Sequence, residues 1–255
     1  MILKIKLVFV CAILCFLSAC ETTSQPNGTG SNANDPVVDR ARAHTELGAA
    51  YLQQNKLEIA LDEFTQATKI APNYALAYNG MALVQAALGE DAEAEANFKQ
   101  SIKLQPTSSE SHNNYGSFLC VRKRYDESIT EILAAVKNPL DATPNLAYAN
   151  AGICADRKKD TKNAEIYLNK ALQIEPLTHS AAQQLAEIQF RRGDAATAKK
   201  TLQNALLASP SPETLWLGVR VARALGEKDN EASYALELRR QYPNSDQTQL
   251  LLSGK

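Results

Sequence analysis

A repeat of 34 residues runs through the chain from residue 41 to residue 246, and it restricts the possible folds more than any other feature. A unit of this length holds two short helices joined by a turn, and it can bury its apolar face only against its neighbours. All intervals between units are 34 residues except the third, which is 36, so the six units begin near Ala41, Ala75, Ser109, Asn145, His179 and Glu213.

Small residues recur at two positions of the unit. When each unit is numbered from its first residue, position 20 is Ala in five units and Ser in the other. Position 8 holds Gly48, Ala82, Gly116, Gly152, Ala186 and Arg220. We therefore expect the two helices of a unit to cross at positions 8 and 20, with the larger apolar residues of position 24, such as Phe64 and Phe98, filling the space between units.

Proline and turn-forming residues punctuate the units. Because proline cannot donate a backbone hydrogen bond, it is expected to end the second helix at position 32, which holds Pro72, Pro106, Pro176 and Pro210. Position 15 holds Asn55, Gly89 and Gly193, residue types that tolerate the left-handed conformation of a turn between helices.

These positions resemble the tetratricopeptide repeat (TPR) consensus over about four-fifths of the chain. The resemblance implies an all-α fold, a TPR superhelix or α-solenoid of six helix-turn-helix repeats over residues 40–246, followed by a tail at residues 247–255. In the sixth unit, Arg220, Arg223 and Arg239 fall at positions where the other units mostly carry smaller or uncharged residues. We interpret them as the polar outer face of a terminal repeat rather than as a basic binding patch.

The first twenty residues have the pattern of a secretory signal. Lys4 and Lys6 precede an apolar run from Leu7 to Leu17, eleven residues long, whereas a membrane-spanning helix needs roughly 20. The run ends in Leu17-Ser18-Ala19-Cys20, which resembles the bacterial lipobox. The resemblance implies that residues 1–19 are removed and that Cys20 carries a lipid; the alternative is a plain signal peptide with an incidental cysteine.

Residues 20–39 are expected to form the lipidated N-terminus and a flexible tether, because Thr, Ser, Asn, Gly, Gln and Pro dominate them without apolar periodicity. Glu21 follows the lipidated position. In lipoproteins of this kind Asp at that position is associated with inner-membrane retention, so the resemblance implies a lipid-anchored protein at the periplasmic face of the outer membrane.

The charge balance excludes several function classes. The chain has 27 Lys and Arg against 28 Asp and Glu, and removal of residues 1–19 takes away two lysines, which leaves 25 against 28. Nothing global therefore attracts nucleic acid or an anionic surface, and we expect the membrane to be contacted through the lipid alone. Charge runs such as residues 157–160 fall in turns between helices, where a solvated face is the expected state.

Catalytic and metal-binding patterns are missing from the sequence. The chain has three histidines, and two of them, His44 and His112, occupy position 4, where TPR units usually place a packing aromatic residue. We find no zinc-ligand spacing, nucleophile elbow or phosphate-binding loop in a suitable context. We expect no enzyme, no metal site and no cofactor apart from the covalent lipid on Cys20.

Two cysteines remain in the mature repeat region. Cys120 and Cys154 lie in the first helices of units three and four, which are neighbours in a TPR stack. An exported protein meets an oxidising compartment, and a disulfide closing a loop of about 35 residues would stabilise by roughly 3–4 kcal/mol. The alternative is a pair of reduced thiols in the core.

In TPR proteins the first helix of each unit lines a concave groove, which is the usual peptide-binding surface of the fold. Asn side chains can pair with both backbone groups of a bound peptide, and Leu and Ile line pockets for its side chains. The expected partner-binding residues are Leu76, Asn79, Leu83, Asn113, Ser117, Leu146, Ala149 and Ile153.

The resemblance narrows further at the segments 112–120, which reads HNNYGSFLC, and 150–154, which reads NAGIC. Together with Cys20 and six units, they resemble the type IV pilus biogenesis and stability lipoprotein family, PilW/PilF. Membership implies binding to the pilus secretin or another pilus-assembly protein, secretin localisation and multimerisation as a pilotin in some members, and pilus stability in others. The alternative is a generic envelope TPR scaffold in outer-membrane or cell-wall assembly, which would use the same anchor and groove.

Overall fold

The computed structural model describes residues 35–139, 143–208 and 210–254. The expected signal peptide, Cys20 and most of the tether lie outside these residues. Residues 34–255 cluster as one compact unit, so the helical region contains its own core. Among the described residues, no helix combines the length and apolar character needed to cross a membrane.

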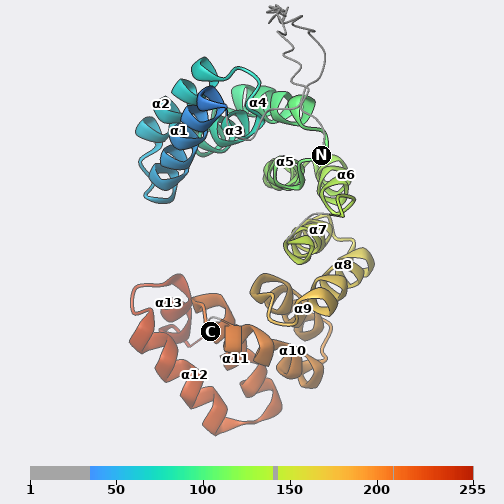
Figure 1. Cartoon of the computed structure of the whole chain (residues 1–255). Helices are drawn as coiled ribbons and strands as arrows, with labels where there is room; N and C mark the ends of the chain where they lie inside the picture. Colours follow the sequence, from blue (N-terminus) through green and yellow to red (C-terminus); the bar gives the residue numbers. More distant parts are fainter. Residues whose placement is uncertain (1–34, 140–142, 209, 255) are drawn as a thin grey trace, which may run out of the picture. The chain divides into compact units, whose positions relative to one another are not determined.

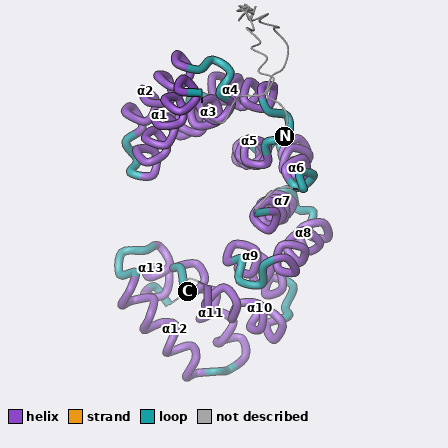
Figure 2. The backbone as a smooth tube through the Cα atoms, viewed as in Figure 1, coloured by secondary structure: helices purple, strands orange, loops and turns teal. Residues whose placement is uncertain are grey.

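The described residues form helices joined by short turns, with no strand among them (Figures 1 and 2). Thirteen helices are present in this part of the chain. Their bounds are α1 Pro36–Gln53, α2 Leu57–Ile70, α3 Ala75–Leu88, α4 Asp91–Leu104, α5 Ser109–Val121, α6 Tyr125–Ala135, α7 Pro144–Arg157, α8 Thr161–Ile174, α9 His179–Arg191, α10 Ala195–Ala208, α11 Pro212–Leu225, α12 Lys228–Gln241 and α13 Asp246–Leu252.

Helices α1 to α12 form six antiparallel pairs, in which each odd-numbered helix packs on the even-numbered helix that follows it. Each odd-numbered helix also contacts the next odd-numbered helix along the chain, from α1 and α3 through to α11 and α13. The expected all-α solenoid of six helix-turn-helix repeats is therefore confirmed, and each seam between units is built by three or four helices.

Glycine permits the closest crossings between helices. The Phe64 ring, at position 24 of the first unit, lies against Gly48 of its own unit and Gly80 of the next, and a Cβ at Gly80 would overlap it. A Cβ on Gly116 would lie 2.9 Å from the Ser128 backbone oxygen. Real Cβ atoms do not approach a carbonyl oxygen this closely without movement of the backbone, so the small residues of position 8 set the spacing between α5 and α6.

The turns inside the pairs reveal an error in the register expected for the sixth unit. Positive φ angles occur at Asn55, Gly89, Lys123, Lys159, Gly193 and Gly226, one in each pair. The last of these lies 33 residues after Gly193, not 34, so the sixth unit begins at Pro212 rather than Glu213. In the corrected register Pro243 falls at position 32, like the prolines that end four earlier units.

The helical region extends beyond both expected boundaries. It begins at Pro36, where the Asp35 side chain caps α1 by accepting a hydrogen bond of 2.8 Å from the Val37 backbone N–H. It continues through α13, which occupies most of the expected tail. Ser245 caps that helix by accepting from the Thr248 N–H, and Thr248 is itself buried. The capping signals at both ends are local, and the repeat period does not include them.

Candidate functional site

Two hollows lie on the surface formed by α3, α5 and α7, which we call the groove face. The first, the Phe118 pocket, has a volume of about 280 Å³ and is lined by Leu83, Ala86, Ala87, Phe98, Asn114, Ser117, Phe118, Val121 and Arg122. The second, the Asn113 pocket, has a volume of about 210 Å³ and is lined by Ser109, Glu110, Asn113, Thr143, Leu146 and Ala147.

A cluster of three aromatic rings forms the floor of the Phe118 pocket. The Phe98 ring lies 5.5 Å from both the Tyr115 and the Phe118 rings, measured between centroids. All three side chains are buried. Such a cluster gives the pocket a rigid apolar base that can receive an aliphatic or aromatic side chain.

Arg122 forms the rim of this pocket. Its guanidinium stacks over Phe118 at 4.9 Å, and its Nε donates a hydrogen bond of 2.8 Å to Asp91 at the start of α4. It also donates to the backbone oxygen of Ala86 over 3.2 Å. The hydrogen bond from Arg122 lowers the pKa of Asp91. The rim is thus held by contacts to two helices of the preceding unit and to a ring of its own.

A charged network lies behind the aromatic floor. Glu95 accepts hydrogen bonds from Arg124 over 2.6 Å and from Tyr115 over 2.9 Å, and it also pairs with Lys99. The bond from Arg124, followed by that from Lys99, lowers the pKa of Glu95 to about 2. Burial and the neighbouring carboxylate raise the pKa of Tyr115, so this phenol remains a donor at neutral pH.

Asparagine side chains link the first helices of units two, three and four. The Asn79 amide donates to Glu110 over 3.0 Å and accepts from Asn114 over 3.4 Å. Asn150 donates to the Asn113 carbonyl over 3.0 Å. Within the described residues, the Asn113 Nδ2 makes no side-chain hydrogen bond, which leaves a donor beside the Asn113 pocket.

The expected groove residues divide according to their exposure. Leu83 and Ser117 line the Phe118 pocket, and Asn113 and Leu146 line the Asn113 pocket. Leu76 and Ile153 are half-buried and line neither pocket.

Two of the eight residues cannot offer a side chain to a partner in this structure. Asn79 is 2% exposed and Ala149 is 0% exposed. Each faces the seam with the next unit: Asn79 bonds to residues of α5, and Ala149 belongs to a core that includes residues of α9. The expectation of a partner contact at these two side chains is therefore wrong.

Sequence reasoning missed Phe118, Val121 and Arg122. These residues lie at and beyond the end of α5, past the last position considered for the groove. Val121 is 57% exposed, and an aliphatic residue immediately before a basic turn was the available signal.

Cys120 and Cys154 form a disulfide between α5 and α7, with their Cα atoms 5.8 Å apart. Both residues are buried, and the Ser128 hydroxyl lies 3.1 Å from the Cys154 sulfur. The bond ties units three and four together directly behind the groove face.

The histidines at position 4 do more than pack. His112 Nδ1 lies 2.8 Å from a Glu131 oxygen, and its Nε2 lies 3.0 Å from the Pro106 carbonyl. The Glu131 contact raises the pKa of His112. His44 makes the equivalent 2.7 Å contact with Glu63 in the first unit. The expectation of simple ring packing is corrected, because each imidazole joins the two helices of its unit through a polar contact.

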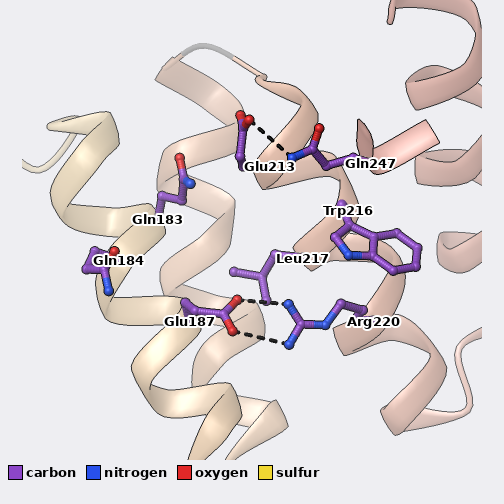
Figure 3. A pocket seen from close by; sticks show the side chains of 8 residues that line it. All are labelled: Gln183, Gln184, Glu187, Glu213, Trp216, Leu217, Arg220 and Gln247. Atoms are coloured by element: carbon purple, nitrogen blue, oxygen red, sulfur yellow. Dashed lines mark hydrogen bonds and ion pairs between the residues drawn. The ribbon is translucent and has the colours of Figure 1, made fainter. Parts of the chain in front are cut away.

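A third hollow, of about 230 Å³, lies where α9, α11 and α13 meet (Figure 3). Arg220 bonds both oxygens of Glu187, over 3.0 and 3.2 Å, and its guanidinium stacks over Phe190 at 4.8 Å. Trp216 and Leu217 also line the hollow. Arg220 therefore joins units five and six at an internal seam, which corrects its interpretation as part of a polar outer face.

Comparison with known families matches the repeat region. Models of the TPR repeat match residues 48–89, and models of the tetratricopeptide repeat match residues 79–147 and 146–176. The type IV pilus assembly protein PilF of Pseudomonas aeruginosa is 28% identical over 247 residues, which is 96% of each chain. The chain belongs to the TPR family, in the group of PilF and PilW.

Solved structures agree with this assignment. The structure of Pseudomonas aeruginosa PilF matches with a TM-score of 0.75 and 26% identity, over 87% of this chain and 100% of that one. PilW, described as a widely conserved type IV pilus biogenesis factor, matches with a TM-score of 0.72 and 28% identity, over 83% of this chain and 98% of PilW. The likeness to PilF and PilW thus extends over nearly all of the helical region.

Proposed function

We propose that this chain is a lipid-anchored protein of the outer membrane that supports type IV pilus biogenesis by binding a pilus-assembly partner, the secretin, through its groove face. In this proposal it aids secretin localisation and multimerisation and so supports pilus stability. The observation that carries the proposal is the similarity to PilF over 96% of the chain, which includes the region of the expected lipobox.

The anchor rests on the sequence Leu17-Ser18-Ala19-Cys20. A lipid on Cys20 would hold the protein at the membrane, and the polar residues that follow would give the helical domain a reach of roughly 20–25 Å. Confinement of this kind raises the effective concentration of the groove face near a membrane-bound partner without any new contact.

The groove face suits a segment that presents an apolar side chain. The Phe118 pocket has an aromatic floor and the aliphatic wall of Leu83, so it can take that side chain. Ser117 beside it, and the Nδ2 of Asn113 in the neighbouring pocket, can bond to the backbone of the bound segment. Arg122 is already bonded to Asp91 and would shape the rim rather than supply a free charge.

Secretin oligomers in outer-membrane fractions test this proposal. We compare the wild type with a deletion strain, Cys20→Ala, Ser117→Arg and the control Ile166→Arg, since Ile166 is exposed on α8 and lines neither pocket of the groove face. The proposal predicts oligomer loss in the deletion, in Cys20→Ala and in Ser117→Arg, with Ile166→Arg like the wild type.

Other outcomes would correct parts of the proposal. Loss only in the deletion would mean that neither the anchor nor the groove face is needed for secretin assembly. Normal oligomers and pili in the deletion strain, together with defects in outer-membrane proteins or the cell wall, would favour the generic scaffold.

A further inference from the structure

The turns between the two helices of units three and four carry unpaired positive charge. Lys123, Arg157 and Lys159 are exposed, and none of them has an ion pair or side-chain hydrogen bond within the described part of the chain. The segments 121–127 and 156–162 together contain seven basic and four acidic residues, whereas the corresponding turn of unit two, residues 87–93, contains three acidic residues and no basic one.

Three ion pairs show that these turns lie at one edge of the stack. Arg122 bonds to Asp91 of the preceding pair, and Arg192 bonds to Glu165 over 2.7 Å in the same manner. Lys158 pairs with Asp126, which likewise belongs to the preceding pair. These contacts neutralise one basic residue in each turn and leave the three unpaired cations projecting outward.

The backbone adds a second observation. Lys123 has a φ of 63° and Lys159 a φ of 73°, while the equivalent residue is glycine in units two, five and six. The left-handed conformation disfavours a side chain by about fivefold or more, and glycine adopts it freely. Two adjacent turns therefore carry a lysine where the backbone favours glycine, which is explained if the charge itself is used.

We propose that this edge, the turn edge of Lys123, Arg157 and Lys159, binds the phosphate headgroups of an anionic lipid surface. The three side chains project from separate turns and line none of the pockets described above, so they suit an extended surface better than a bound peptide. The exposed Val121 beside them can rest between headgroups. Lysine acts toward phosphate as a flexible point charge, which requires no fixed geometry.

Such a contact would orient the domain on the membrane. The near-neutral composition argues against a global attraction, but the attraction of a lipid surface acts only within about 10 Å and depends on the local charge. Only the nearness of lipid rests on the anchoring proposed above. Contact along this edge would leave the groove face available to a partner.

Vesicle sedimentation tests the inference on residues 34–255, which form a compact unit with their own core. The probes are vesicles of pure phosphatidylcholine and vesicles with about 30% phosphatidylglycerol, at low salt. The variants are Lys123→Gly with Lys159→Gly and Lys123→Gln with Lys159→Gln. The control is Lys69→Gln with Lys103→Gln, which removes two exposed lysines from the ends of α2 and α4.

The wild type should bind the anionic vesicles and not the neutral ones. Each lysine contributes about fivefold, so both double variants should bind about 25-fold more weakly, while the control pair should bind like the wild type. The glycine variant should also melt at the same temperature as the wild type or higher, because it relieves the left-handed side chains. A loss of binding in this variant could not then be attributed to unfolding.

Three results would overturn the inference: equal binding to both vesicle types, unchanged binding of the double variants, or lysine-dependent binding to a soluble poly-glutamate peptide without binding to vesicles. The last result would assign the edge to an acidic protein segment. None of these results depends on the secretin or on the lipid at Cys20, so failure here is distinct from failure of the proposed function.

Discussion

Replacing Gly116 by alanine is expected to destabilise the helical domain by about 2 kcal/mol. The added Cβ would lie 2.9 Å from the Ser128 oxygen and 3.0 Å from the Ile132 nitrogen, and it would overlap the Ile132 side chain. Two of these contacts are with backbone atoms, so a change of rotamer cannot relieve them and α5 must move away from α6. Overpacking of this kind costs about 3 kcal/mol, and the higher helix propensity of alanine offsets about 1 kcal/mol.

Urea unfolding of residues 34–255, followed by circular dichroism with the disulfide intact, measures the effect. Helix propensity alone predicts the opposite sign, a gain of about 1 kcal/mol. Ala50→Gly, at an exposed position of α1, measures that propensity in the same protein and should lose about 1 kcal/mol. A Gly116→Ala variant as stable as the wild type, or more so, would refute the close crossing of α5 and α6.

Three further predictions concern stability and titration. Cys120→Ser with Cys154→Ser should lower the free energy of unfolding by about 4 kcal/mol in urea, from the loop-closure entropy of the 34-residue separation, and an unchanged midpoint would contradict it. Because the pKa of Glu95 is lowered from 4.5 to about 2, its stabilisation is complete above pH 4.5 and is lost as the pH falls toward 2. The urea midpoint of the wild type should therefore fall more steeply over this range than that of Glu95→Gln, and parallel curves would contradict this. The raised pKa of His112 stabilises the fold below pH 6.5 and is lost as the pH rises through the folded pKa, so an NMR titration should give a value above 6.5 that Glu131→Gln lowers.

The repeat period predicted the paired helices and most of their turns, because each unit repeats the same local demands. Gly89 and Gly193 lie in the expected left-handed turns. The sixth unit was misplaced by one residue because a single deletion leaves no strong local mark. The signals that locate it, Gly226 and Pro243, agree with one another only in a 33-residue interval.

The candidate site was harder to predict than the fold, since its residues meet across units. Asn79 and Asn113 occupy the same position of neighbouring units, yet the first is buried by Glu110 and Asn114 and the second lies beside a pocket. A position in the repeat places a residue on a helix face but does not determine what the next unit lays against it. Arg122 illustrates the same limit, because its partner Asp91 is 31 residues away.

Site-specific photocrosslinking in pilus-producing cells tests the central claim most directly. A benzoylphenylalanine at position 117 would sit in the Phe118 pocket, and the same residue at position 166 would sit on the exposed face of α8. The proposed function predicts a secretin adduct from position 117 and none from position 166. A secretin adduct from position 166, with none from position 117, would contradict binding through the groove face.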